Sequence, residues 1–122
     1  MTITCFIRYE IDPFGKDAFE HYARAWGQVI PRCGADLIGY YAPHEGSATT
    51  AYAAYNIESL AAYEAYRARL AADPAGKANY AFARREKFIV KEDRVFLKLV
   101  SGPHGPRRLF QTDVAVKEGI EA

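Results

Sequence analysis

Strand-like and helix-like hydrophobic patterns follow one another along this chain in an order that few folds accommodate. In residues 2–11 apolar and polar side chains alternate, which predicts a strand with one buried face. One side consists of Ile3, Cys5, Ile7, Tyr9 and Ile11, and the other of Thr4, Phe6, Arg8 and Glu10. Residues 12–15 have turn composition, and the apolar positions of residues 17–32 recur near the helical period. The chain therefore begins with a strand and an amphipathic helix.

The middle of the chain has the features of a hairpin followed by a helical region with a break. The segments 37–42 and 49–56 have strand-like composition and are separated by turn-forming residues. Ser59 can cap the next helix, and the pair Asp73 and Pro74 interrupts it. Because aspartate caps helices and proline fits their first turn, we expect a second helical piece to begin there.

Residues 88–100 predict a final strand, with a bulge where residues 91–94 interrupt the alternation. Its apolar row consists of Val95, Leu97 and Leu99. The resulting order, β-α-β-β-α-β, is typical of the ferredoxin-like fold, an α+β fold with an antiparallel sheet and helices on one face. We predict one such domain over residues 1–100.

Residues 101–122 form a C-terminal extension that is too short to be a domain. In it, Phe110, Thr112, Val114 and Val116 alternate with Gln111, Asp113 and Ala115. This pattern favours an arm that adds a strand to a partner chain by edge pairing, and the alternative is a frayed tail.

Composition excludes several classes of function. The 122 residues carry a formal net charge of +1, which supplies no basic field for nucleic acid. No apolar run approaches the roughly 20 residues of a membrane helix, and no basic leader precedes the first strand, so we expect a cytoplasmic protein. Cys5 and Cys33 lack the spacing of a disulfide framework or a metal site, and no cofactor or metal is expected.

The second face of the predicted sheet favours a homodimer. Two helices cover only one face of a four-stranded sheet, and the other face is mixed, with Phe6 and Phe96 among polar residues. Two copies packed face to face would protect both open faces and enclose a cavity at a symmetric interface.

Several segments resemble the NIPSNAP family. They are residues 4–8, the turn at 13–16, residues 39–41 and, above all, the helical stretches ESLAAYEAYR at 58–67 and LAADP at 70–74. The resemblance covers roughly residues 3–100. It implies a dimeric α/β barrel of two ferredoxin-like protomers. It implies no established catalytic chemistry, because the roles described for the family are in trafficking or signalling.

The candidate site residues fall into two groups. The first, expected to line the cavity of the barrel, consists of Arg8, Glu10, Tyr40, Arg94, Phe96 and Lys98. Arginine would pair with the carboxylate of a small planar or acidic ligand, and aromatic rings would stack on it. The alternative is that these charges form ion pairs between strands or across the dimer. The second group is His44 beside Glu45, in the hairpin loop, where the alternative is a solvated pair.

The sequence favours binding of a small molecule or a partner over catalysis. It contains no glycine-rich phosphate loop and no nucleophile elbow, which excludes nucleotide enzymes and serine hydrolases. Dimeric α/β barrels also include cofactor-independent monooxygenases, so an enzyme of that kind, acting on a small aromatic or acidic substrate, is the alternative.

Overall fold

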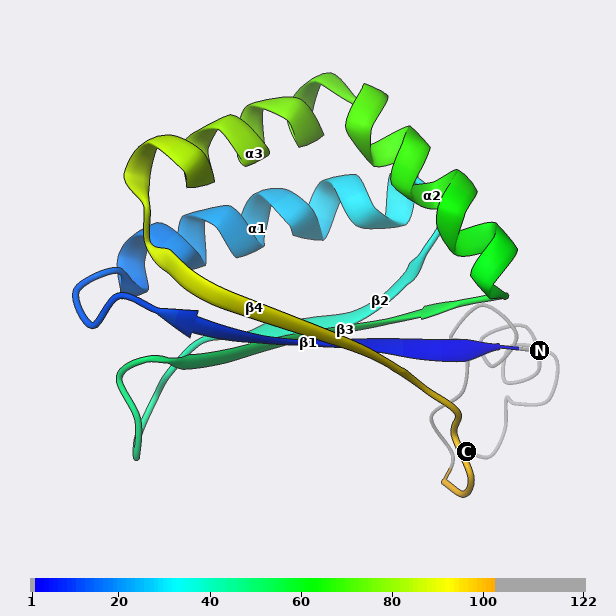
Figure 1. Cartoon of the computed structure of the whole chain (residues 1–122), viewed down its shortest axis with the longest axis horizontal. Coiled ribbons are helices and arrows are strands. Elements are labelled where there is room, and N and C mark those ends of the chain that lie inside the picture. The colour runs from blue at the N-terminus through cyan, green and yellow to red at the C-terminus, as the bar shows by residue number, and fades with distance from the viewer. Residues whose placement is uncertain (1, 103–122) are drawn as a thin grey trace, which may run out of the picture.

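The computed structural model describes residues 2–102, which form one antiparallel sheet covered on one face by helices (Figure 1). The strands are β1 (Ile3–Ile11), β2 (Asp36–Tyr41), β3 (Thr50–Ile57) and β4 (Ile89–Leu97), in the order β2-β3-β1-β4. The helices are α1 (Lys16–Arg32), α2 (Leu60–Ala72) and α3 (Pro74–Glu86). This arrangement confirms the predicted ferredoxin-like α+β fold. The proposed arm lies outside the described residues, except for residues 101 and 102.

The break between α2 and α3 falls at the predicted residues. Ser59 caps α2 by accepting a hydrogen bond from the backbone N–H of Ala62 at 3.0 Å. Asp73 caps α3 by accepting from the N–H of Gly76 at 2.9 Å, and Pro74 occupies the first turn. Arg32, at the end of α1, donates to both carboxylate oxygens of Asp73. This ion pair joins the end of α1 to the break between α2 and α3.

The last strand is shorter than expected and its irregularity lies slightly earlier. β4 covers residues 89–97 instead of 88–100. Glu10 is opposite Lys91 and Ile11 is opposite Ile89, so Val90 is the extra residue of a bulge. The bulge was expected within residues 91–94, where the ladder is in fact regular.

The core lies between the sheet and the helices. The odd-numbered residues of β1 from Cys5 to Ile11 are all buried against it. The helix α1 contributes Phe19, Tyr22, Trp26, Val29 and Ile30. Asn79 of α3 is 4% exposed, and its side-chain amide donates to the backbone carbonyl of Tyr22 at 3.0 Å. This bond anchors α3 to α1 over the core.

No helix among residues 2–102 covers the other face of the sheet, and this face is partly apolar. Its half-exposed hydrophobic residues include Phe6, Tyr41, Tyr52, Val95 and Leu97. The mixed open face expected from the sequence is therefore present, but the two rows of β4 are exchanged. Val95 and Leu97 lie opposite Phe6 and Thr4 on the open face, whereas Arg94 and Phe96 lie on the helix-covered face with Ile7 and Cys5.

Candidate functional site

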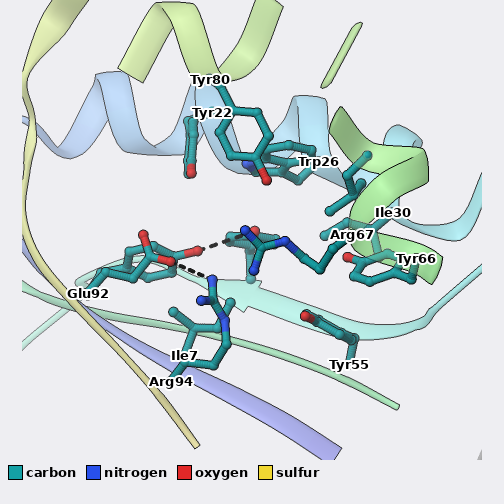
Figure 2. Close-up of a pocket in the computed structure, with 13 residues that line it drawn as sticks. Ile7, Tyr22, Trp26, Ile30, Tyr55, Tyr66, Arg67, Tyr80, Glu92 and Arg94 are labelled. Carbon is teal, nitrogen blue, oxygen red and sulfur yellow. Dashed lines mark hydrogen bonds and ion pairs between the residues drawn. The ribbon is translucent and has the colours of Figure 1, made fainter. Parts of the chain in front are cut away.

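A pocket lies between the sheet and the helices, and aromatic side chains from both layers line it (Figure 2). Its volume is about 30 Å³, and its walls include Tyr9, Tyr22, Trp26, Tyr40, Tyr55, Tyr66 and Tyr80. The charged residues Arg67, Glu92 and Arg94 also line it. Six of the nine tyrosines and the single tryptophan of the chain are thus gathered around one small space.

The register of β4 against β1 brings the charges of β4 to this pocket. Arg94 is opposite Ile7 and Glu92 is opposite Tyr9, so both charged residues share the helix-covered face with the core residues of β1. Arg94 donates from Nη2 to Glu92 Oε2 at 2.6 Å. Their side chains are 30% and 32% exposed, which places this ion pair at the mouth of the pocket.

The second arginine reaches the pocket from α2. Arg67 donates from Nη1 to the hydroxyl of Tyr63, one helical turn earlier, at 2.7 Å. Its guanidinium carbon lies 5.7 Å from the centre of the same ring. Figure 2 shows Arg67 and Arg94 extending into the space framed by Tyr22, Tyr55 and Tyr80. No carboxylate among residues 2–102 pairs with Arg67, so its charge is not neutralised by the described part of the chain.

The phenols around the pocket keep their protons at neutral pH. Burial raises the pKa of Tyr22 to about 12. Burial also raises the pKa values of Tyr9, Tyr40, Tyr55 and Tyr66. The hydroxyls of Tyr9 and Tyr40 lie 3.4 Å apart and can share one hydrogen bond. The tyrosines are therefore neutral groups that can donate hydrogen bonds.

The electrostatics favour an anion. Burial opposes the charge of Arg94, but its interactions with Tyr63 and Glu92 outweigh burial and raise its pKa, so it stays protonated. Among the residues that line the pocket, Glu92 is the only carboxylate, and Arg94 already holds it. A site of guanidinium and phenol donors suits the binding of an acceptor-rich anion better than the removal of a proton.

The structure divides the predicted barrel-facing set between the two faces of the sheet. Tyr40 and Arg94 line the pocket, and Phe96 lies beside it, with its ring centre 4.7 Å from that of Tyr63. Arg8 and Glu10 lie on the open face and form an ion pair with each other at 4.0 Å. The expected grouping on one face is wrong, because the register places Arg94 opposite Ile7 and not opposite Arg8.

The remaining predicted residues lie apart from the pocket. Lys98 follows the end of β4 and is exposed. His44 and Glu45 are exposed and line a shallow groove of about 450 Å³ with Pro13 and Lys16, where the loops after β1 and β2 meet. These residues do not join the arginine and tyrosine cluster.

Sequence reasoning missed Arg67, Glu92 and most of the tyrosines. Tyr66 is a buried residue of α2, and Arg67 is its direct neighbour in the sequence. Tyr63, Arg67 and Leu70 are spaced like one helix face, which is a signal that an arginine shares the inward stripe. Glu92 lies two residues before Arg94, and this spacing in a strand places both on one face.

The described residues contain neither a membrane-crossing helix nor a metal cluster. No helix within residues 2–102 is long and apolar enough to cross a membrane. In the same part of the chain, no three side chains of histidine, cysteine, aspartate or glutamate gather as they would around a metal ion.

Over residues 2–102, the sheet order, the single layer of helices and the internal pocket define a ferredoxin-like α+β domain with an arginine- and tyrosine-lined cavity. Within this class, the chain belongs to the NIPSNAP family, whose sequence model matches residues 4–103. The resemblance inferred from the helical stretches is therefore confirmed. No curated protein matches the chain.

Solved structures with the same fold include members of this family and more distant proteins. A NIPSNAP-like domain protein from Burkholderia xenovorans is 24% identical, with 86% of this chain and 92% of its own covered and a TM-score of 0.68. A NIPSNAP family protein of unknown function from Agrobacterium tumefaciens is 19% identical, with coverages of 80% and 87% and a TM-score of 0.69. A protein from Chloroflexus aurantiacus, described provisionally as an antibiotic biosynthesis monooxygenase, is 14% identical, with coverages of 87% and 99% and a TM-score of 0.59. At these identities the likeness shows the fold alone.

Proposed function

We propose that the protein binds a small aromatic acid in the pocket between its sheet and its helices, and that it does so as a homodimer. The observation that carries the proposal is that the guanidinium of Arg67 has no carboxylate partner within residues 2–102. This guanidinium lines the pocket, has only a phenol as its hydrogen-bond partner within the described residues, and stands among neutral donors. A carboxylate is the group that complements it.

The size of the pocket limits how the acid can enter. A volume of about 30 Å³ accommodates a group the size of a carboxylate, since one water needs about 10–15 Å³ on the same measure. The aromatic ring of the ligand needs more room. Arg67 is exposed and its side chain is long, so its guanidinium can swing outward with the acid and open the space beside Tyr80 and Trp26.

The open face of the sheet supports the dimer. Phe6, Val95 and Leu97 are 39%, 49% and 52% exposed there, which is unusual for a face of a stable monomer. The neighbouring charges alternate, because Arg8 is opposite Asp93 and Glu10 is opposite Lys91. A face with balanced charges and an apolar centre can pack against the same face of a second copy across a two-fold axis without placing like charges together.

Binding to Arg67 can be tested with the fluorescence of Trp26, the only tryptophan, which lies in the pocket wall. We expect benzoate to change this fluorescence in a saturable way. Arg67→Gln should weaken the affinity by about tenfold to hundredfold, since a hydrogen bond to a charged group contributes about 1.5–3 kcal/mol. The matched control is Arg24→Gln, because Arg24 lies on the exposed side of α1 and pairs with Glu20. Equal affinity of the Arg67 variant and the unaltered protein would contradict the proposal.

A second candidate is a cofactor-independent monooxygenase that acts on an electron-rich aromatic acid. Two observations favour it: the phenol-lined pocket beside two guanidiniums, and the provisional description of the Chloroflexus aurantiacus structure. Such an enzyme needs a substrate that itself supplies electrons to dioxygen. Oxygen uptake with gentisate, an aromatic acid with two hydroxyl groups, should then exceed the uptake of the Arg67→Gln variant. Equal uptake would leave binding as the function.

The proposal places the protein in the cytoplasm, with neither nucleic acid nor a membrane as its partner. The support is the net charge of +1 and the lack of a membrane-crossing helix in residues 2–102. Fractionation of the cells that make the protein tests this location, and recovery with the membrane fraction would contradict it.

A further inference from the structure

The charges at the mouth of the pocket are unequal in number. Arg67 and Arg94 contribute two positive charges, and Glu92 contributes one negative charge. The tyrosines of the wall are neutral and add none. The described residues of the site therefore carry one excess positive charge before any ligand enters.

The position of Glu92 decides which arginine is available. Glu92 and Arg94 are two residues apart on one face of β4, and the 2.6 Å contact between Glu92 Oε2 and Arg94 Nη2 engages the guanidinium directly. In the described part of the chain, the only hydrogen-bond partner of the Arg67 guanidinium is the hydroxyl of Tyr63. One carboxylate of a ligand can thus pair with Arg67, whereas a second carboxylate would meet Arg94 with Glu92 already beside it.

We propose that Glu92 restricts the pocket to acids with a single negative charge. The carboxylate of Glu92 occupies the position on Arg94 that a second ligand carboxylate would need, and its negative charge repels the second carboxylate of a dianion. This inference rests on the proposed function, because it names the class of acid that the same pocket accepts. Glu92 is thus a residue that determines specificity, beyond the contacts that bind the ligand.

The competing explanation is that Glu92 only holds the side chain of Arg94 in place. The two roles predict different changes in the affinity for the dianion when Glu92 is neutralised. If Glu92 only positions Arg94, its neutralisation leaves Arg94 less well ordered and weakens the binding of monoanions and dianions alike. If it excludes a second charge, its neutralisation leaves the monoanion nearly unchanged and strengthens the dianion.

The test compares benzoate with phthalate, which carries two carboxylates on the same ring, by Trp26 fluorescence at about pH 8, where both acids are fully ionised. The unaltered protein should bind benzoate more tightly, by about tenfold. Glu92→Gln should shift the ratio of the two affinities toward phthalate by about tenfold. Glu92→Asp, which keeps the charge, should retain the original preference. The control Glu86→Gln removes a charge at the exposed end of α3, where Glu86 pairs with Arg85, and should change nothing.

The outcomes separate this inference from the function on which it rests. If benzoate binds and requires Arg67 but Glu92→Gln leaves the ratio of affinities unchanged, Glu92 does not select charge and the inference is overturned. If neither acid binds to any variant, the proposed function is wrong and the inference falls with it. A circular dichroism spectrum of each variant confirms that it is folded.

Discussion

Arg94 of β4 lies directly opposite Ile7 of β1, and this pairing places a guanidinium on the face of the sheet that the helices cover. A shift of one residue would move Arg94 to the open face and Val95 into the core. The pocket and the apolar open face are therefore two consequences of one register. Because Val95 and Leu97 face outward, Arg94 faces the helices and lines the pocket together with Arg67 and the tyrosines.

The open face can be tested by placing a charge at its centre. Val95 is 49% exposed beside Phe6, and Val95→Glu would bury a carboxylate in each copy of a dimer that packs there. We expect light scattering to give about twice the protomer mass of 13.7 kDa for the unaltered protein and a mass near 13.7 kDa for the variant. The control is Leu60→Glu, on the exposed first turn of α2, which should remain dimeric. An unaltered protein with the mass of one protomer would disprove the homodimer.

The hydrogen bond between Asn79 and α1 should contribute measurably to stability. Its side chain is buried, and Asn79→Ala removes the 3.0 Å bond to the carbonyl of Tyr22. We expect the free energy of unfolding to fall by about 1 kcal/mol, which urea denaturation at a fixed protein concentration measures. Lys77→Ala, at an exposed position of the same helix, should stay close to the unaltered value. Equal stability of the two variants would show that the buried amide is not needed.

Asp73 should give the protein an acid-sensitive contribution to stability. The N–H of Gly76 and the guanidinium of Arg32 lower the pKa of Asp73 below its usual 3.8. Because the pKa is lower in the folded state, the stabilisation is present above 3.8 and is lost as the pH falls through the folded-state value. Asp73→Asn should therefore unfold at a lower temperature than the unaltered protein at neutral pH, and this gap should close under strongly acidic conditions. A gap that persists there would mean that the charge of Asp73 is not responsible.

The tyrosine cluster should make the protein sensitive to alkali. The pKa of Tyr22 is raised from 10.0 to about 12, and burial also raises those of Tyr9 and Tyr40. Since these values are higher in the folded state, the stabilisation is complete below about pH 10 and is lost as the pH rises through the folded-state values. An ultraviolet titration should show that some of the nine tyrosines ionise only in alkali strong enough to unfold the chain. Ionisation of all nine near pH 10 in the folded protein would contradict the described burial.

The element order was predictable because its signals are local. The alternation in β1, the cap at Ser59 and the pair Asp73 and Pro74 are each set by the chemistry of neighbouring residues. The same reasoning located the helical stretch that carries the family resemblance. These features can be recognised in the sequence without knowing which strands pair.

The faces of β4 and the membership of the pocket were not predictable in this way. Phe6 and Phe96 each have a polar residue two positions before and two positions after, so the two strands look alike, yet the register places these rings on opposite faces. In the sequence, an apolar row on the open face of a sheet resembles one that faces the core, so the outward direction of Val95 and Leu97 could not be predicted. Tyr40 and Arg94, predicted to line the cavity of a dimeric barrel, line the pocket on the helix-covered face instead. The helical spacing of Arg67 indicates its face of α2, but its place in the pocket and its lack of a carboxylate partner within residues 2–102 depend on how α2 packs against β3.

The most direct test of the account is a crystal structure of the protein soaked with benzoate. The account expects the ligand between the sheet and the helices, with a carboxylate oxygen about 2.7–2.9 Å from a guanidinium nitrogen of Arg67 and the ring beside Trp26 and Tyr80. A pocket that stays closed at saturating benzoate, with Arg67 still on Tyr63, would contradict the claim that this site binds aromatic acids.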